Sequence, residues 1–407
     1  MNWVPTTLGG VISLEYGRPL PRHVRDESGA VPVAGSNGED GRHNVALVNG
    51  PGIVVGRKGS AGKVTWFGGD FWPIDTAYYV RTDKRMADLR WLFYLLNFNS
   101  LERLNKSTGV PGLNRNDVYA EKCMLPPISE QQRIVEILDE VHRLRNVHFA
   151  TDAKAMRILP ALFFKMFGDP ATNPKAWTVR SIGEIAKLVT SGSTPRGGAE
   201  VYVSEGPYLI RSQNVLMNRL ELSNAARITS ETHLQMSRTI VFEGDVLLNI
   251  TGASIGRVTY VDKLDSEANV NQHVCIIRPN KSQVLPAYLS ACLSMPFHQS
   301  TINSVQIGAS RQALNHVQVR ALKIAVPPIE QQHLFSNLAK EMEHQLARSE
   351  ASGKRLDDLF SVLMQKAFCG QLTAKWREAH MKELLVEMEE QTRLLALQPY
   401  RELETIQ

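Results

Sequence analysis

The chain has 407 residues, of which 43% are hydrophobic and 21% charged, an ordinary composition for a globular protein with two or three domains. Its net charge of +5 at pH 7 permits nucleic-acid binding but does not by itself indicate it. The four cysteines are far apart, which argues against a disulfide framework or zinc site and favours reduced, mostly buried thiols in a cytoplasmic protein. No signal peptide is visible, and no apolar run approaches the roughly 20 residues that cross a bilayer.

Each half of the chain begins with short β-like runs that are broken by glycine and followed by a helical stretch. This pattern predicts two mixed α+β domains. The expected strands of the first half are 52–56, 63–67 and 77–80, with a helix at 88–104. Those of the second half are 208–211, 245–250, 256–261 and 273–277, with a helix at 286–302.

A long helix is predicted after the first domain, over 129–167. It follows the Pro126-Pro127 pair, and its apolar residues recur every three or four positions, so it would be amphipathic and about 58 Å long. Ser129 is expected to cap its first turn, with Gln132 at the capping-box position. Pro160 and the unpatterned stretch 148–152 are the places where it is expected to kink or break.

The same signature returns at Val326–Gly370. Pro-Pro-Ile and Glu-Gln-Gln recur there, aligned with one residue deleted between them. The leucines that follow keep a near-heptad spacing, which suits packing against another helix. Two long helices with matching starts indicate a duplicated chain.

Further matches between the halves support the duplication. Trp3 and Leu14 are followed at one constant offset by Trp177 and Leu188, and the pair Leu113-Asn114 is followed by a second Leu-Asn pair at 314–315. Ordered matches with a drifting offset are the trace of a tandem repeat with insertions in its second copy. The predicted divisions are a first domain at 1–125, a first long helix at 126–168, a second domain at 169–326, a second long helix at 327–370 and a tail at 371–407. Within the tail, Met381–Leu397 is expected to be a peripheral or partner-docked helix.

No motif in the sequence proposes a reaction. The glycine-rich stretch Gly56–Val64 fails as a P-loop, because Arg57 takes the place of the first glycine and Val64 that of the magnesium-binding hydroxyl. There is no GxGxxG after a strand, no HExxH, and no Asn/Asp-Pro-Pro-Tyr/Phe segment. Isolated histidines such as His273 and His316 are more often structural or solvated than catalytic. A stand-alone nuclease or methyltransferase with unrecognised motifs, and a scaffold that does not read DNA, remain alternatives.

The loops are rich in hydrogen-bond donors. Arginine and lysine read guanine, asparagine and glutamine read adenine, and serine and threonine bind phosphates, so these clusters favour contact with nucleic acid. The expected DNA-contacting residues are Arg57, Lys58, Ser60, Lys63, Arg115, Ser193, Thr194, Arg196, Arg211, Gln213, Asn214, Thr251, Ser254, Arg257, Ser310, Arg311 and Gln312. No residue is proposed as catalytic or as a metal ligand.

Over nearly its whole length the chain resembles the specificity subunit of type I restriction-modification systems. The resemblance rests on the two Pro-Pro-Ile…Glu-Gln-Gln segments, on Met-Phe-Gly-Asp-Pro at 166–170, and on Trp177 with the Ser-Gly-Ser-Thr-Pro run at 191–195. Gly370-Gln-Leu-Thr-Ala-Lys-Trp-Arg is similar to the closing segment of that family. The first domain has Tyr16-Gly17-Arg18-Pro19 in place of the Ser/Thr-rich loop of the second.

The resemblance implies an α+β fold with two tandem target-recognition domains, separated by two long antiparallel spacer helices and related by internal pseudo-two-fold symmetry. Each domain would read one half of a bipartite double-stranded DNA target, and the helices would set the gap between the halves. The chain would have no active site and no cofactor of its own, and no membrane association. Two modification subunits and the restriction subunits would dock on it, bringing S-adenosylmethionine, ATP and Mg²⁺ for adenine methylation and antiviral defence.

Overall fold

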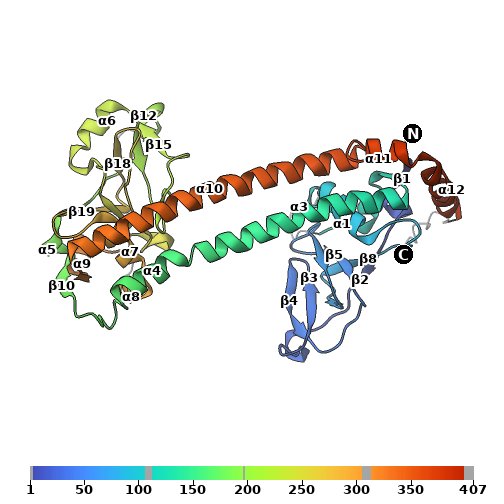
Figure 1. Cartoon of the computed structure of the whole chain (residues 1–407), viewed down its shortest axis with the longest axis horizontal. Coiled ribbons are helices and arrows are strands. Elements are labelled where there is room, and N and C mark those ends of the chain that lie inside the picture. The colour runs from blue at the N-terminus through green and yellow to red at the C-terminus, as the bar shows by residue number, and fades with distance from the viewer. Residues whose placement is uncertain (1–2, 106–111, 196–197, 305–312, 398–407) are drawn as a thin grey trace. The chain divides into compact units, whose positions relative to one another are not determined.

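The computed structural model in Figure 1 describes residues 3–105, 112–195, 198–304 and 313–397. Its contacts divide the chain into two compact units. The first unit is Met1–Phe149 with Ser352–Gln407, and the second is Ala150–Ala351. Each unit contains one α+β domain together with the adjoining parts of the long helices.

The α+β domain of the first unit is built on three small sheets. Strands β2, β8, β5 and β6 form an antiparallel sheet in that order; β4, β3 and β7 form a second, and β1 pairs with β9. Every residue of β5 is buried, as its uninterrupted apolar run predicts. The elements are β1 Val4–Thr7, β2 Ser13–Tyr16, β3 Val31–Gly35, β4 Gly38–His43, β5 Gly52–Gly56, β6 Val64–Phe67, β7 Trp72–Pro73, β8 Ala77–Arg81, α1 Leu89–Phe98, α2 Arg115–Tyr119 and β9 Lys122–Leu125.

The second unit repeats this plan. Its sheets have the orders β11–β19–β16–β17, β15–β12–β18 and β10–β20, which match those of the first unit strand for strand. The predicted duplication is therefore confirmed by the topology, with the β13–β14 hairpin added in the second copy. The elements are β10 Thr178–Ser181, α5 Ile182–Ile185, β11 Ala186–Ser191, β12 Tyr202–Ile210, β13 Val215–Leu216, β14 Arg219–Leu220, β15 Ala226–Ile228, α6 Ser230–Gln235, β16 Val246–Asn249, β17 Val258–Tyr260, β18 Ala268–Val270, β19 Val274–Pro279, α7 Pro286–Ser294, α8 Pro296–Ser304, α9 His316–Ala321 and β20 Lys323–Val326.

A long helical segment follows each domain. The first is divided into α3 (Ile128–Ala155) and α4 (Ile158–Phe167), whereas the second is the single 40-residue helix α10 (Ile329–Phe368). The helix passes unbroken through 148–152, one of the two predicted weak points, and ends at Ala155, before the helix that contains Pro160. Pro160 lies in the first turn of α4, where its missing N–H costs no hydrogen bond.

The long helices pack antiparallel within each unit. In the first unit, Arg145 of α3 forms an ion pair with Asp357 of α10 (2.7 Å), while the earlier residue Leu138 shares a core with the later residue Met364. In the second unit, Asp152 accepts a hydrogen bond from Ser349 at 2.6 Å, and the rings of Phe163 and Phe335 lie edge to face at 5.7 Å. In both units, therefore, residue numbers rise along one helix as they fall along the other.

The structure corrects the alignment of the two helix starts. Nε2 of Gln131 donates to the carbonyl oxygen of Pro126 at 2.8 Å, and Nε2 of Gln332 donates to that of Pro327 at the same distance. Both glutamine side chains are buried. Gln131 is thus the counterpart of Gln332, and the two segments align without the expected one-residue deletion. A buried glutamine that closes the turn after the prolines is the shared feature.

The prediction that Ser129 caps the first long helix is wrong. The helix begins at Ile128, so Ser129 lies within its first turn. The carboxylate of Glu387, in the tail helix α12 (Met381–Leu397), accepts hydrogen bonds from the backbone N–H (2.9 Å) and the hydroxyl of Ser129. The expected tail helix therefore exists and docks on its own first unit, where it caps α3. The counterpart of Ser129 in the second copy is Glu330, itself an acid in the first turn of its helix.

The segment before α12 includes α11 (Ala374–Ala379). This segment and the start of the chain both contact one buried carboxylate. Glu130 is 0% exposed and forms an ion pair with Arg377 at 2.7 Å. The Nε1–H of Trp3 and the hydroxyl of Thr373 also donate to this carboxylate, at 2.9 and 2.5 Å. N- and C-terminal segments are thereby joined within the first unit.

Candidate nucleic-acid interface

One edge of the first unit gathers the ends of several strands. Tyr16 ends β2, Gly56 ends β5, and the residue before β8, Thr76, lies between them. The backbone N–H of Lys58 donates to the carbonyl oxygen of Thr76 at 3.1 Å. The N–H of Leu113, just before α2, donates to that of Arg57 at 2.9 Å. The glycine-broken loop after β5 and the start of α2 are therefore held side by side at this edge.

A tyrosine flanked by two arginines forms the centre of this edge. The guanidinium carbon of Arg57 lies 5.0 Å from the centroid of the Tyr16 ring, and that of Arg115 lies 5.3 Å from it. Tyr16 is 48% exposed, and its ring lies 5.1 Å from that of Tyr78. Burial, followed by the neighbouring Tyr16, raises the pKa of Tyr78 to about 12, so that phenol stays neutral. Stacked guanidinium groups keep their donors directed along the ring plane.

The remaining predicted residues of the first domain lie close by. Lys58 and Ser60 are exposed on the loop. Nζ of Lys63 donates to the backbone and side-chain oxygens of Asn37, at 2.9 and 2.7 Å, and so joins the loop to the β3–β4 turn. Nη1 of Arg57 donates to the carbonyl oxygen of Asp75 at 2.8 Å. Neither Arg115 nor the exposed Lys58 makes a side-chain hydrogen bond among the described residues, so both have donors available to a ligand.

The second unit has an equivalent edge. The N–H of Gly192, just after β11, donates to the carbonyl oxygen of Asn271 at 3.2 Å, and the N–H of Asn271 donates to that of Ile210, the last residue of β12, at 3.0 Å. Nδ2 of Asn249, at the end of β16, donates to the carbonyl oxygen of Ser212 at 2.8 Å. The ends of β11, β12 and β16 and the start of β19 therefore converge here.

The backbone frame of this edge is the same in both units. Leu314 donates its N–H to the carbonyl oxygen of Ile250 at 2.8 Å, just as Leu113 does to that of Arg57. The lone β-bridge between Thr251 and Ala313 corresponds to the one between Lys58 and Gly112. Two copies of one scaffold thus present different side chains at matching positions.

Two histidines occupy the edge of the second unit, where the sequence indicated only solvated or structural roles for them. Nε2 of His316 lies 2.9 Å from Oγ of Ser191, and Nδ1 of His273 lies 2.5 Å from Oγ1 of Thr251. His316 follows the Leu-Asn pair as Arg115 does, and Ser191 ends β11 as Tyr16 ends β2. The contact between His316 and Ser191 is therefore the counterpart of the stacking of Arg115 on Tyr16. The preceding Leu-Asn pair was the sequence signal for His316, whereas the equivalence of Tyr16 and Ser191 comes from the strand register.

The other predicted residues of the second domain differ in accessibility. Ser193, Thr194, Gln213 and Arg257 are exposed, and Ser254 is half-buried beside Arg257. Arg196, Ser310, Arg311 and Gln312 lie outside the described residues.

Asn214 is only 3% exposed, and its amide is used by the backbone. Its Oδ1 accepts from the N–H of Arg211 at 3.0 Å, and its Nδ2 donates to the carbonyl oxygen of Glu221 at 3.0 Å. We therefore assign Asn214 to the support of the loop and leave it out of the proposed interface.

The cysteines match the expectation of free, mostly buried thiols. Cys123, Cys275 and Cys292 are buried and Cys369 is exposed. Burial raises the pKa of each of the three buried thiols to about 12, so they stay protonated. Across the described residues, no group of three or more His, Cys, Asp or Glu side chains could hold a metal ion, and no helix has the length and apolarity to span a bilayer.

Two copies of one α+β domain, each with a donor-rich edge and a long helix, define a duplicated recognition protein. The chain matches the type I restriction modification DNA specificity domain over residues 1–148 and 174–342. It is 29% identical to the EcoBI specificity subunit of Escherichia coli over 182 residues, which span 43% of this chain and 37% of that protein. It is 19% identical to the MjaVIII specificity subunit of Methanocaldococcus jannaschii over 311 residues, 72% of each chain.

Solved structures show the same fold. The S subunit of the type I system of M. genitalium has a TM-score of 0.63 at 15% identity, with 90% of this chain and 96% of that one covered. The chain belongs to the type I restriction-modification DNA specificity family. It is accordingly a DNA specificity subunit by family.

Proposed function

We propose that this chain reads a bipartite double-stranded DNA target, one half at the strand-end edge of each unit. The observation that carries the proposal is the pair of matching edges, which share backbone hydrogen bonds but present Tyr16 and Arg115 in one unit and Ser191 and His316 in the other. A common frame with different donors and acceptors is what two different half-sites require, because side chains read base edges while the frame positions them.

The long helices would set the gap between the half-sites and dock two modification subunits, which restriction subunits then join in the cytoplasm. S-adenosylmethionine, ATP and Mg²⁺ would be bound by those partners, and the chain itself would carry no cofactor. Antiparallel helix packing in each unit supports the spacer role, because a packed helix pair holds its length.

The proposal is tested by exchanging residues 1–125 for the corresponding segment of a relative with a different target. Methylome sequencing of cells that carry the chimaera and the modification subunits should show one half of the methylated sequence replaced and the other retained. Because the exchanged boundary lies at the end of β9, the long helices stay intact. An unchanged target, or a change in both halves, would contradict the assignment of one half-site to each unit.

Within the first half-site, Arg115 is expected to read a guanine. Its guanidinium is stacked on Tyr16, and a bidentate arginine–guanine contact discriminates against other bases by about 1–3 kcal/mol, or roughly 10–100-fold. A complex of the modification subunits with the Arg115→Ala variant should therefore methylate the natural target and its single-base variants at that position at similar rates. Arg133→Ala, which removes an exposed arginine paired with Glu136 on α3, should leave discrimination unchanged. Slower methylation of all targets with the base preference intact would reassign Arg115 to the DNA backbone.

A further inference from the structure

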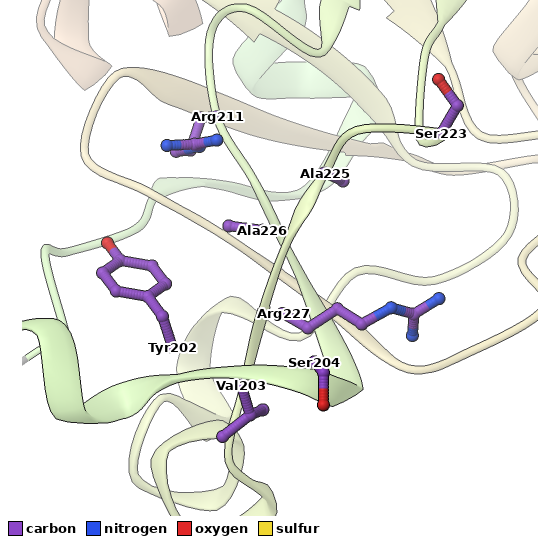
Figure 2. Close-up of a pocket in the computed structure, with 8 residues that line it drawn as sticks. All are labelled: Tyr202, Val203, Ser204, Arg211, Ser223, Ala225, Ala226 and Arg227. Carbon is purple, nitrogen blue, oxygen red and sulfur yellow. The ribbon is translucent and has the colours of Figure 1, made fainter.

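A polar pocket of ≈ 430 Å³ opens on the second unit beside β12 and β15 (Figure 2). Its lining includes the arginines Arg211 and Arg227, the hydroxyl groups of Tyr202, Ser204 and Ser223, and, among the described residues, no carboxylate. The composition of this lining suits an anion.

The pocket lies where β12 has a wide bulge against β15. Arg227 of β15 is paired both with Val203 and with Tyr208, so the intervening residues bulge out of the ladder. Gly206 lies in this bulge with φ +143°, and a Cβ there would lie 2.4 Å from the carbonyl oxygen of Ile228. Only glycine fits that position. The bulge brings the start of β12, with Tyr202, to the same pocket as Arg211, which follows its end.

The two arginines differ in how they are held. Arg227 donates from Nη1 to the carbonyl oxygen of Gly206 (2.6 Å) and from Nη2 to the hydroxyl of Tyr208 (2.8 Å), and stacks on that ring at 4.0 Å. The Arg227 guanidinium is therefore already bonded to residues of the bulge. In Arg211, by contrast, Nε is buried and has no hydrogen-bond partner in the described structure. The two Nη groups of Arg211 likewise donate to no acceptor among the described residues, and Arg211 lines the pocket, so these terminal donors are available to an anion there.

Arg211 also lies at the strand-end edge. Ile210, immediately before it, accepts a hydrogen bond from Asn271, which links β12 to the loop that carries His273. Figure 2 shows the Arg211 guanidinium on the Tyr202 side of the pocket, whereas the Arg227 side chain points away from that side. An anion that contacts Arg211 would therefore lie next to the edge proposed to read bases.

We propose that this pocket binds a backbone phosphate of the DNA beside the second half-site, with Arg211 as its charged donor. The inference rests on the proposed function and adds to it a fixed phosphate contact. Such a contact orients the duplex against the reading edge without reading sequence itself. Arg227 keeps the bulge open and is a positioning residue.

The test compares Arg211→Gln with Arg238→Gln, a matched loss of an exposed arginine in the same unit that does not line the pocket. Equilibrium binding of target and unrelated DNA by the full chain in its complex is measured across a salt series. Arg211→Gln should bind both DNAs about tenfold more weakly, and its slope of log Kobs against log[salt] should be shallower by about 0.9, the value for one phosphate. Arg238→Gln should keep the wild-type slope.

A second measurement locates the phosphate. Single methylphosphonate substitutions, which neutralise one phosphate each, should identify a position in the second half-site that weakens binding by the wild type but not by Arg211→Gln. The proposal is overturned if the slope is unchanged, if no position shows this pattern, or if Arg211→Gln alters the preferred base. Specific methylation by the wild type is measured in parallel, so that failure of the phosphate contact is distinguished from failure of the proposed function.

Discussion

Insertion of the same seven residues into both α3 and α10 is expected to move the methylated half-sites about three base pairs further apart. Seven residues nearly complete two helical turns, so the residues on either side of the insertion keep the same helix face. They also add about 10 Å to the helix, which corresponds to about three base pairs because DNA rises about 3.4 Å per base pair. The insertion belongs after Phe149 in α3 and after Glu350 in α10. Along each helix, the insertion point lies between the Arg145–Asp357 contact of the first unit and the Asp152–Ser349 contact of the second.

Methylome sequencing gives the gap directly, since the natural target should lose methylation and the widened one should gain it. Insertion into α10 alone is the control. It shifts one helix against the other and should abolish methylation at both spacings. Methylation at the original spacing by the doubly extended chain would show that the helices do not set the gap.

Glu130→Gln is expected to lower the free energy of unfolding of the first unit by about 3–5 kcal/mol, because it leaves the buried Arg377 guanidinium without its counter-charge. Trp3 and Thr373 lose a charged acceptor in the same step. Urea unfolding followed by tryptophan fluorescence suits the test, since of the six tryptophans only Trp177 lies in the second unit.

Glu136→Gln is the matched control, because Glu136 forms an exposed ion pair with Arg133 on the same helix, and its loss should cost about 1 kcal/mol or less. The double variant Glu130→Met/Arg377→Met should recover part of the lost stability, since an apolar pair leaves no buried charge unpaired. If both glutamine variants were equally stable, the buried carboxylate would not hold the terminal segments together.

The architecture was predictable because a duplicated chain repeats its motifs at ordered spacings. The matching sheet orders of the two units confirm the duplication. The details of the helix starts were not. Matching Glu-Gln-Gln letter for letter favoured a deletion, whereas the buried glutamine after each proline pair sets the true register. Ser129 had the residue type of an N-cap, but the cap comes from Glu387 in a helix 258 positions away in sequence, and no local pattern announces such a partner.

The candidate interface shows the same division. Donor-rich loops after the strands were identified from composition, and the structure brings Arg57, Lys58 and Arg115 to one edge. Asn214 is excluded from the interface because it is buried, and burial depends on the whole fold, which the local sequence does not reveal. His316 was passed over because an isolated histidine carries little signal. Only its alignment with Arg115, through the preceding Leu-Asn pair, places it at an equivalent position.

The docking of α12 makes the starts of the two long helices chemically different. In the first copy the carboxylate of Glu387 covers the start of the long helix, whereas in the second copy Glu330 places a negative charge in the first helical turn. A partner that recognises the helix start therefore meets two chemically different surfaces on one chain. Under the proposed function, two identical modification subunits that dock at the helix starts would therefore bind the two copies with unequal affinity.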